Sequence, residues 1–342
     1  MRPLIRRRKD ERVEEILKDL KFGELQLNKL KRVAELRGES LEKTVSRTFR
    51  NLMSVVPASI KPRNIVTDAP VKSISHEDGL VKIVLDNERV TWNFPSRQRY
   101  ANLYYTFRDL VPRFVDAASY GPYHDVAFRY LAATKTPYFP THDGAVVIEG
   151  GAYIGIKALG YYDAIESNGK VIAIEIGGEQ YRLLCRNVEA NGLQGKIIPV
   201  RCGIWHEAGE MEAEFEVYAS HSLRPPDEHK HYSRRETVPT NTLDNIIDEY
   251  SLEVVDYLNL QINGAEGNAI DGLQRNFDKV KIIYVGAHYT LDGAPHDQVT
   301  VKQLQDRGCT ILYKTKGSIW AVTPKWAHEF EPMKGWSMDW VR

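Results

Sequence analysis

Two acidic residues end neighbouring apolar runs in the second half of this 342-residue chain. The first run, Val146–Ile148, leads into Glu149 and then into a turn at 150–155 that reads Gly-Gly-Ala-Tyr-Ile-Gly. The second run, Val171–Ile174, ends at Glu175. Because glycine has no side chain, such a turn lets the backbone approach a bound molecule closely. The pattern therefore predicts a ligand site.

The chemistry of these residues indicates which ligand the site would take. The free amides of a helix that follows the turn favour a carboxylate, and Glu149 can meet an ammonium group. Glu175, at the end of the next strand, can reach the two hydroxyls of a ribose. S-adenosyl-L-methionine carries an amino-acid end and a ribose, so we expect it as the cofactor.

The predicted cofactor residues are the turn, the two strand-end acids and two positions beyond them. They are Glu149, Gly150, Gly151, Ala152, Tyr153, Gly155, Glu175, Ile176 and Gly203. A dinucleotide-binding oxidoreductase uses the same geometry but needs Gly-x-Gly-x-x-Gly. Counted from Gly151, the third and sixth positions here are Tyr153 and Ile156. A nicotinamide cofactor is therefore disfavoured, and a turn with a purely structural role stays open as an alternative.

The elements that must position these residues alternate between strand and helix after Pro140. Runs rich in β-branched residues predict strands at Val146–Glu149, Val171–Glu175, Ile197–Arg201, Tyr257–Ile262 and Ile282–Gly286. Helical stretches are expected at 154–166, 179–191, 241–250 and 265–276. This alternation is typical of a parallel sheet covered on both faces. The runs Cys309–Thr315 and Ser318–Thr323 predict an antiparallel hairpin that closes it. The expected fold class is therefore α/β and Rossmann-like, over residues 136–342.

Two further regions precede this domain in the predicted organisation. Residues 1–55 are expected as a basic helical extension, because Val13, Ile16, Leu17 and Leu20 form one apolar stripe. Residues 56–135 are expected as an accessory region. It begins with a connecting segment at 56–79 and a β-hairpin of Leu80–Leu85 and Val90–Phe94, and helical stretches follow.

Four motifs in this domain occur in the order of a known family. Glu149–Gly155 matches Asp-Val-Gly-Ala-Asn-Ile-Gly, and Glu175-Ile176 matches a strand end of Glu-Pro. The helix after it supplies Leu-x-x-Asn-x-x-x-Asn through Leu184, Asn187 and Asn191, and Thr242–Asp244 supplies Thr-Leu-Asp. From about 140 to 325 the chain resembles the FkbM-type methyltransferases. The resemblance implies a class I methyltransferase fold with a mostly parallel sheet and S-adenosylmethionine as methyl donor.

The fourth motif of that family departs from the pattern. The family's Lys-Ile-Asp-Val-Glu-Gly-Ala-Glu aligns with 259–266, where Asn259, Gln261 and Asn263 replace Lys, Asp and Glu. Only Glu266 keeps its charge. Tyr153 also replaces the family's Asn in the first motif. The cofactor half of the pattern is thus preserved better than the catalytic half.

Methyl transfer to a hydroxyl needs a group that takes the proton, usually a histidine or a carboxylate. The predicted catalytic residues are His288 and Glu266, which follow strands of the sheet, and Gln261, which stands in the family's Asp position. Glu266 has an alternative role as a cap of the helix that follows it. No metal is expected, because the loss of that Asp removes the obvious ligand.

Composition limits the partners and the compartment. The 46 basic and 46 acidic residues give no net charge, so nucleic acid is not expected as a partner. No apolar run reaches the length of a membrane span. Three scattered cysteines predict a reducing, cytoplasmic location.

The resemblance implies a glycan or a small metabolite as the methyl acceptor. A cofactor-binding interaction module with weakened catalysis is the rival function, and the oligomeric state is left open, a homo-oligomer included.

Overall fold

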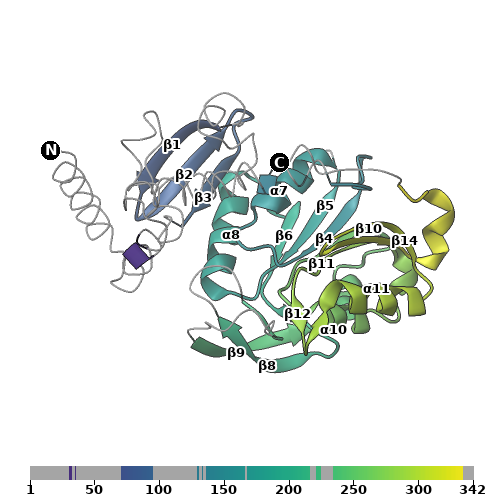
Figure 1. The fold of residues 1–342 in the computed structure, drawn as a ribbon. Coiled ribbons are helices and arrows are strands. Elements are labelled where there is room, and N and C mark those ends of the chain that lie inside the picture. Colours follow the sequence, from purple (N-terminus) through teal and green to yellow (C-terminus); the bar gives the residue numbers. More distant parts are fainter. Residues whose placement is uncertain are drawn as a thin grey trace. The chain divides into compact units, whose positions relative to one another are not determined.

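The computed structural model describes residues 31–32, 35, 71–94, 129–130, 133, 136–165, 168–215, 221–224 and 234–333. The chain divides into two compact units, one of residues 1–128 with 337–342 and one of residues 129–336 (Figure 1). Nearly all of the predicted helical extension lies outside the described residues, which include only three helical positions there. No described helix has both the length and the apolar character to cross a bilayer.

The first unit contains an antiparallel sheet in the order β1-β2-β3. The predicted hairpin is present as β2 (Leu80–Leu85) and β3 (Val90–Asn93). A third strand, β1 (Val71–Glu77), lies in the segment that was predicted to be a connection, so that prediction was wrong for these residues. Asp78 and Gly79 join β1 to β2 with φ of 54° and 74°. A two-residue Asp-Gly turn with both φ positive is a strong hairpin signal, and it stands in the sequence.

The second unit is built on a seven-stranded sheet in the order β14-β15-β11-β10-β4-β5-β6. Its strands are β4 (Val146–Gly150), β5 (Lys170–Ile174), β6 (Ile197–Val200), β10 (Val255–Leu260), β11 (Val280–Gly286), β14 (Thr310–Thr315) and β15 (Ser318–Val322). All neighbours from β6 to β11 pair in parallel, and β15 is antiparallel to both β11 and β14. The predicted parallel sheet with an antiparallel closing strand is confirmed.

One face of this sheet is covered by three helices. They are α9 (Leu243–Glu249), α10 (Glu266–Asp271) and α11 (His296–Asp306). Their apolar side chains form one buried cluster with Ile148, Leu258 and Ile283 of the strands. Alternate residues of a strand point to opposite faces of a sheet. The residues that precede and follow Ile148, Leu258 and Ile283 along their strands therefore face the other side.

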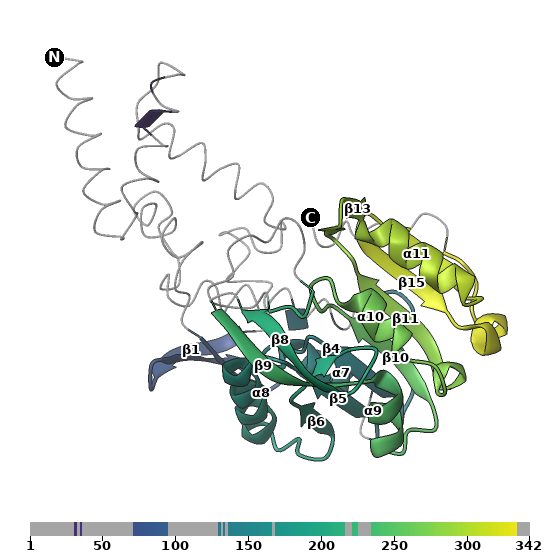
Figure 2. The same cartoon turned by 90° about the horizontal axis from the view of Figure 1, so that it is seen from below.

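The other face carries aromatic and polar side chains beneath α7 (Ile156–Ala164), the helix that follows the glycine turn. Tyr161 of α7 packs on Tyr257 of β10, with ring centroids 6.2 Å apart. Trp320 donates from Nε1 to the hydroxyl of Tyr257 at 3.2 Å. The helix α8 (Gly178–Ala190) contacts α7 and the edge strand β6. Figure 2 shows the sheet between its two layers of helices.

A smaller sheet accompanies the large one. It contains β7 (Gly203–Ile204), β8 (Gly209–Phe215) and β9 (Arg234–Asn241) in the order β7-β9-β8. Neither this sheet nor α11 was predicted. The buried positions of α11 are His296, Thr300 and Leu304, so its inward face contains two polar residues and gives little apolar periodicity.

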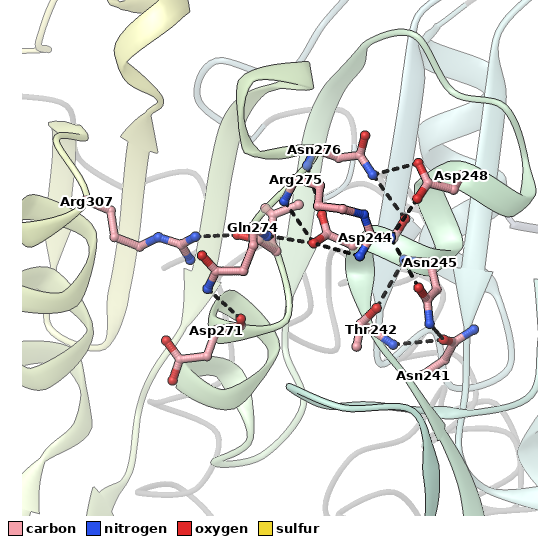
Figure 3. Close-up of polar contacts among 11 residues, drawn as sticks. Asn241, Thr242, Asp244, Asn245, Asp248, Asp271, Gln274, Arg275, Asn276 and Arg307 are labelled. Carbon is pink, nitrogen blue, oxygen red and sulfur yellow. Dashed lines mark hydrogen bonds and ion pairs between the residues drawn. The ribbon is translucent and has the colours of Figure 1, made fainter.

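The Thr-Leu-Asp motif forms a polar corner between α9 and the loop after α10 (Figure 3). Thr242 caps α9 by accepting from the amide of Asn245 at 3.0 Å. The buried carboxylate of Asp244 accepts from the amides of Gln274, Arg275 and Asn276, each at 2.9 Å. The amides of residues 274–276 thus bond to Asp244 and not to carbonyl groups of α10. The helix α10 ends at Asp271, whereas the predicted helix continued to residue 276.

Candidate functional site

The glycine turn and the end of β10 meet at the carboxyl edge of the sheet. Gly151 has φ of 82°, and a Cβ at this position would lie 2.2 Å from the carbonyl oxygen of Gln261. The amide of Gln261 donates to the carbonyl oxygen of Gly150 at 3.1 Å. Only glycine allows this approach, so the turn is needed to bring the two loops together.

Glu175 closes the turn from the neighbouring strand. Its carboxylate accepts from the amides of Tyr153 and Gly177, both at 2.7 Å, and its side chain is buried. Burial raises the pKa of Glu175 to about 7, while these amides and the charge of Arg129 act in the opposite direction. The guanidinium of Arg129 lies 5.1 Å from the ring centroid of Tyr153, so the turn also has a cation above it.

Glu149 belongs to a row of side chains that crosses the sheet under α7. It lies beside Asn259 of β10, which in turn lies beside Tyr284 of β11. Glu149 Oε2 and both amide atoms of Asn259 are buried and have no hydrogen-bond partner among the described residues. Burial raises the pKa of Glu149, and the nearby charges of Lys157 and Arg129 oppose that shift.

Gln261 links this row to the helix above it. Lys157 of α7 donates from Nζ to Gln261 Oε1, and Gln261 donates from Nε2 to the hydroxyl of Tyr284 at 3.2 Å. Burial lowers the pKa of Lys157, the charge of Glu149 opposes that shift, and the charge of Arg129 adds to it. The amide that replaces the family's Asp is thus held between a lysine and a tyrosine.

Glu266 holds the loop that follows β10. Its carboxylate accepts from the amides of Ile262 at 2.8 Å and Gly264 at 2.9 Å. His296 Nε2 lies 3.0 Å from Glu266 Oε2, the oxygen that also accepts from Gly264. The side chains of His296 and Glu266 are almost fully buried. These contacts are with the loop before α10 and not with the amides of that helix, so the capping role and the catalytic role of Glu266 both stay predictions.

His288 follows β11 and lies against the hairpin turn of β14 and β15. A Cβ at Gly317 would lie 2.2 Å from His288 Nδ1, so the glycine makes room for the imidazole. His288 as a whole residue is exposed. Partial desolvation by the chain around the ring lowers the pKa of His288, although Glu266 and Asp297 act against that shift. The imidazole is therefore neutral at pH 7 and can accept a proton.

Ile176 and Gly203 lie together beside the smaller sheet. A Cβ at Gly203 would lie 2.7 Å from Leu223 Cδ1 and 3.1 Å from Ile176 Cδ1. Gly155, in contrast, lies against Leu184, which belongs to α8. Ala152 is buried, and its amide donates to the carbonyl oxygen of Ile174 at 2.9 Å. The structure thus groups the predicted cofactor residues around the ends of β4, β5 and β6.

Two residues of this edge were not found from the sequence. Lys157 stands two positions after the glycine turn, where a lysine also fits a solvent-facing helix position. Tyr284 stands inside an apolar strand, where an aromatic residue is ordinary. A signal was available for Lys157, because it is four residues before Tyr161 and so shares the helix face that packs on the sheet.

The strand order and the strand-end acids define an α/β Rossmann-like domain of the class I methyltransferase type. Residues 149–308 match the family model described as the methyltransferase FkbM domain. The match covers less than half of the chain, and this stretch is similar to the FkbM methyltransferase domain. A comparison with curated proteins finds no match.

Solved structures similar to this chain are methyltransferases of several kinds. The FkbM methyltransferase of Methylobacillus flagellatus is 16% identical over 67% of this chain and 63% of its own, with a TM-score of 0.38. The chain thus spans less than two thirds of that protein. Fibrillarin of Aeropyrum pernix, solved with S-adenosyl-L-methionine, is 14% identical over 74% of this chain and all of its own, with a TM-score of 0.34. TrmK of M. capricolum, solved with S-adenosylhomocysteine, is 11% identical over 57% of this chain and 66% of its own, with a TM-score of 0.34.

Proposed function

We propose that this protein is an S-adenosylmethionine-dependent methyltransferase that methylates a hydroxyl group of a glycan or a small metabolite. The observation that carries the proposal is the pairing of the glycine turn with Glu175, whose buried carboxylate faces the amide of Tyr153. The free carboxylate oxygen of Glu149 supplies the complementary group for an ammonium. These two acceptors suit the ammonium and the ribose hydroxyls of the cofactor.

The bound cofactor would supply an activated methyl group on a sulfonium. Glu175 would accept from the ribose hydroxyls, and the backbone of Gly150 and Gly151 would let the ligand lie close to the strand ends. Gln261 and Lys157 would border the acceptor. His288 would take the proton from the acceptor hydroxyl, since its lowered pKa keeps the imidazole neutral at pH 7. Such a base contributes roughly 10²–10⁴-fold to a rate.

The rival is a cofactor-binding module without methyl transfer. The observation that favours it is the replacement of the motif's charges by Asn259, Gln261 and Asn263. Asn263 is held by contacts of its own, since it donates to the carbonyl oxygen of His221 at 3.1 Å and accepts from Tyr289 at 2.8 Å. We favour the enzyme because Gln261 is bonded to a lysine and faces the same edge as the glycine turn.

The three free cysteines support a cytoplasmic location.

Binding of S-adenosylhomocysteine tests the cofactor assignment and has a defined pH dependence. The ionised Glu175 is the stronger acceptor, and its pKa of about 7 means that protons compete with the ligand below pH 7. Affinity measured by calorimetry is expected to rise about tenfold from pH 6 to pH 8, since the carboxylate is about one-tenth ionised one unit below its pKa. Glu175→Gln is expected to bind at least tenfold more weakly at pH 8 and to show a smaller pH dependence, because only Glu149, whose pKa is also raised by burial, then titrates in the cofactor site.

Glu179→Gln is the matched control, because it removes the same charge from an exposed position of α8. It is expected to bind like the wild type. Equal affinity of Glu175→Gln and wild type at pH 8 would remove Glu175 from the site. If the wild type binds no S-adenosylhomocysteine, the cofactor assignment fails.

Transfer of a tritiated methyl group to acceptors in cell extracts and glycan panels separates the enzyme from the rival. The enzyme is expected to label a product, and His288→Ala is expected to lower the rate by roughly 10²-fold or more. A wild type that binds the cofactor and labels nothing supports the rival.

A further inference from the structure

The row of polar side chains beneath α7 has hydrogen-bonding capacity that the described residues do not use. Glu149 Oε2, Asn259 Oδ1 and Asn259 Nδ2 are all buried without a partner. A buried polar atom without a partner destabilises the folded chain. Three such atoms on two adjacent strands are the mark of a polar site that receives water or the polar groups of a ligand.

Lys157 of α7 lies near this row of polar side chains. Tyr161 fixes α7 on the sheet by packing on Tyr257, and Lys157, one helical turn before it, reaches Gln261. Within the described part of the chain, no carboxylate forms an ion pair with Lys157, and its hydrogen-bonded partner is a neutral amide. Glu149 is near enough for its charge to favour the ammonium. Arg129 is close enough for its charge to disfavour the charged form of Lys157. A half-buried ammonium without a bonded carboxylate therefore has capacity for an anion.

The family motif strengthens this interpretation. Where that motif has Asp and Glu, this chain has Gln261 and Asn263, so two negative charges are removed from the edge that Lys157 faces. The same change replaces the motif's own Lys by Asn259, and Lys157 provides a cation from α7 instead. The motif thus has one negative charge less than the family's motif, so this part of the edge repels an anion less, although Glu149 remains nearby.

We propose that Lys157 and Gln261 bind an anionic group, a carboxylate or a phosphate, of the methyl acceptor, so that the acceptor is an acidic glycan or an acidic metabolite. This inference rests on the proposed function and adds the acceptor's charge to it. In the transfer step, the acceptor's hydroxyl oxygen bonds to the methyl carbon. The carbon–sulfur bond breaks with its electron pair left on sulfur, and the hydroxyl proton passes to His288. The anionic group stays unmodified and paired with Lys157.

The cofactor has a carboxylate of its own, which is the other source of the same chemistry. We assign Lys157 to the acceptor because its bonded partner Gln261 belongs to β10, whereas the turn that suits the cofactor follows β4. The two sources are separated by comparing S-adenosylhomocysteine with 5′-methylthioadenosine, which has no carboxylate. Lys157→Gln is expected to bind both as the wild type does. A loss of more than tenfold for S-adenosylhomocysteine alone would assign Lys157 to the cofactor and overturn the proposal.

Inorganic phosphate tests the anion site directly on the full chain loaded with S-adenosylhomocysteine. At constant ionic strength, phosphate is expected to bind the wild type saturably, and Lys157→Gln at least tenfold more weakly. Lys157→Arg is expected to stay within threefold of the wild type. Gln261→Asp is expected to bind at least tenfold more weakly, because it places a carboxylate next to the ammonium. Lys302→Gln removes an equal charge at an exposed position of α11 and is expected to change nothing.

The outcomes separate this inference from the proposed function. Phosphate that binds Lys157→Gln as well as the wild type, or that binds neither, overturns the anion site. The tritiated product of the extract assay is expected to be retained on an anion exchanger at pH 8, and a neutral product overturns the inference while leaving the methyltransferase in place. A wild type that labels nothing contradicts the proposed function, and the phosphate measurement then still decides whether Lys157 binds anions.

Discussion

Backbone conformation decides several identities in the glycine turn. Gly151 and Gly155 both have φ of 82°, and Tyr153 between them has φ of 54°. A positive φ costs an ordinary L-residue roughly 1–2 kcal/mol, and asparagine tolerates it better than an aromatic residue. The family's Asn at this position suits the conformation, and Tyr153 occupies it with its ring against Arg129. The turn thus keeps its shape although its most unusual residue does not favour that shape.

Gly151→Ala is expected to destabilise the domain by at least about 3 kcal/mol. The added Cβ would lie 2.2 Å from the carbonyl oxygen of Gln261, so the two loops must separate, and the residue also keeps a positive φ. Gly195→Ala is the matched control, since Gly195 has φ of 77° and nothing within 4 Å of its Cβ position. It is expected to cost about 1 kcal/mol. Equal losses in urea unfolding would mean that the close approach does not matter.

The strand-end acids were predictable from the sequence, but their neighbours were not. Glu149 and Glu175 follow apolar runs, and a parallel sheet brings such positions to one edge, so their proximity is predictable. Lys157 and Gln261 meet because α7 packs at one angle on β10, and that angle depends on the fit of Tyr161 against Tyr257. Side-chain packing of this kind has no signature in the spacing of one motif.

At the scale of elements, the Thr-Leu-Asp motif is a structural joint. Asp244 accepts three backbone amides of the loop 274–276, and Asn276 donates from its side chain to the carbonyl oxygen of Asp244 at 3.1 Å (Figure 3). Arg275 adds an ion pair to Asp248 at 2.7 Å. The joint connects α9 to the loop before β11. It therefore helps to position the start of β11.

Asp244→Ala is expected to lower the free energy of unfolding by about 3–5 kcal/mol, because it leaves three backbone amides without their acceptor. Asp306→Ala is the control, since Asp306 pairs with Lys302 on the exposed side of α11. An exposed pair of this kind contributes about 0.3–0.5 kcal/mol. Urea unfolding of both variants measures the difference. Losses below about 1 kcal/mol for Asp244→Ala would contradict the joint.

The elements themselves were predictable where burial is two-sided. In β5 the residues Val171–Ile174 are all apolar and all buried, and continuous apolar runs of this kind predict central parallel strands. The helix α11 and the strand β1 were missed for the opposite reason. Polar residues fill the buried face of α11, and β1 is mostly polar, with Ser73 and Ser75 among its residues. Their positions are decided by partners distant in the sequence, which a local pattern does not contain.

At the scale of the whole molecule, the second unit begins at residue 129, seven residues before the start predicted for the Rossmann-like domain. Tyr130 and Ala133 are buried. The hydroxyl of Tyr130 donates to Asp163 Oδ2 at 2.5 Å, and a Cβ at Gly160 of α7 would lie 2.7 Å from the carbonyl oxygen of Tyr130. This segment therefore packs on the helix that carries Lys157, so we propose residue 129 as the domain boundary.

Two fragments test this boundary. Residues 129–336 contain the whole seven-stranded sheet, so this fragment is expected to unfold cooperatively and to bind S-adenosylhomocysteine within about threefold of the full chain. Residues 136–336 lack Tyr130 and Ala133, and burial of a large aromatic side chain contributes about 3–5 kcal/mol. The shorter fragment is thus expected to lose about 3 kcal/mol in urea unfolding and to bind more weakly, because α7 loses its support. Equal stability of the two fragments would return the boundary to residue 136, and failure of the longer one to fold would make the first unit part of the same folding domain.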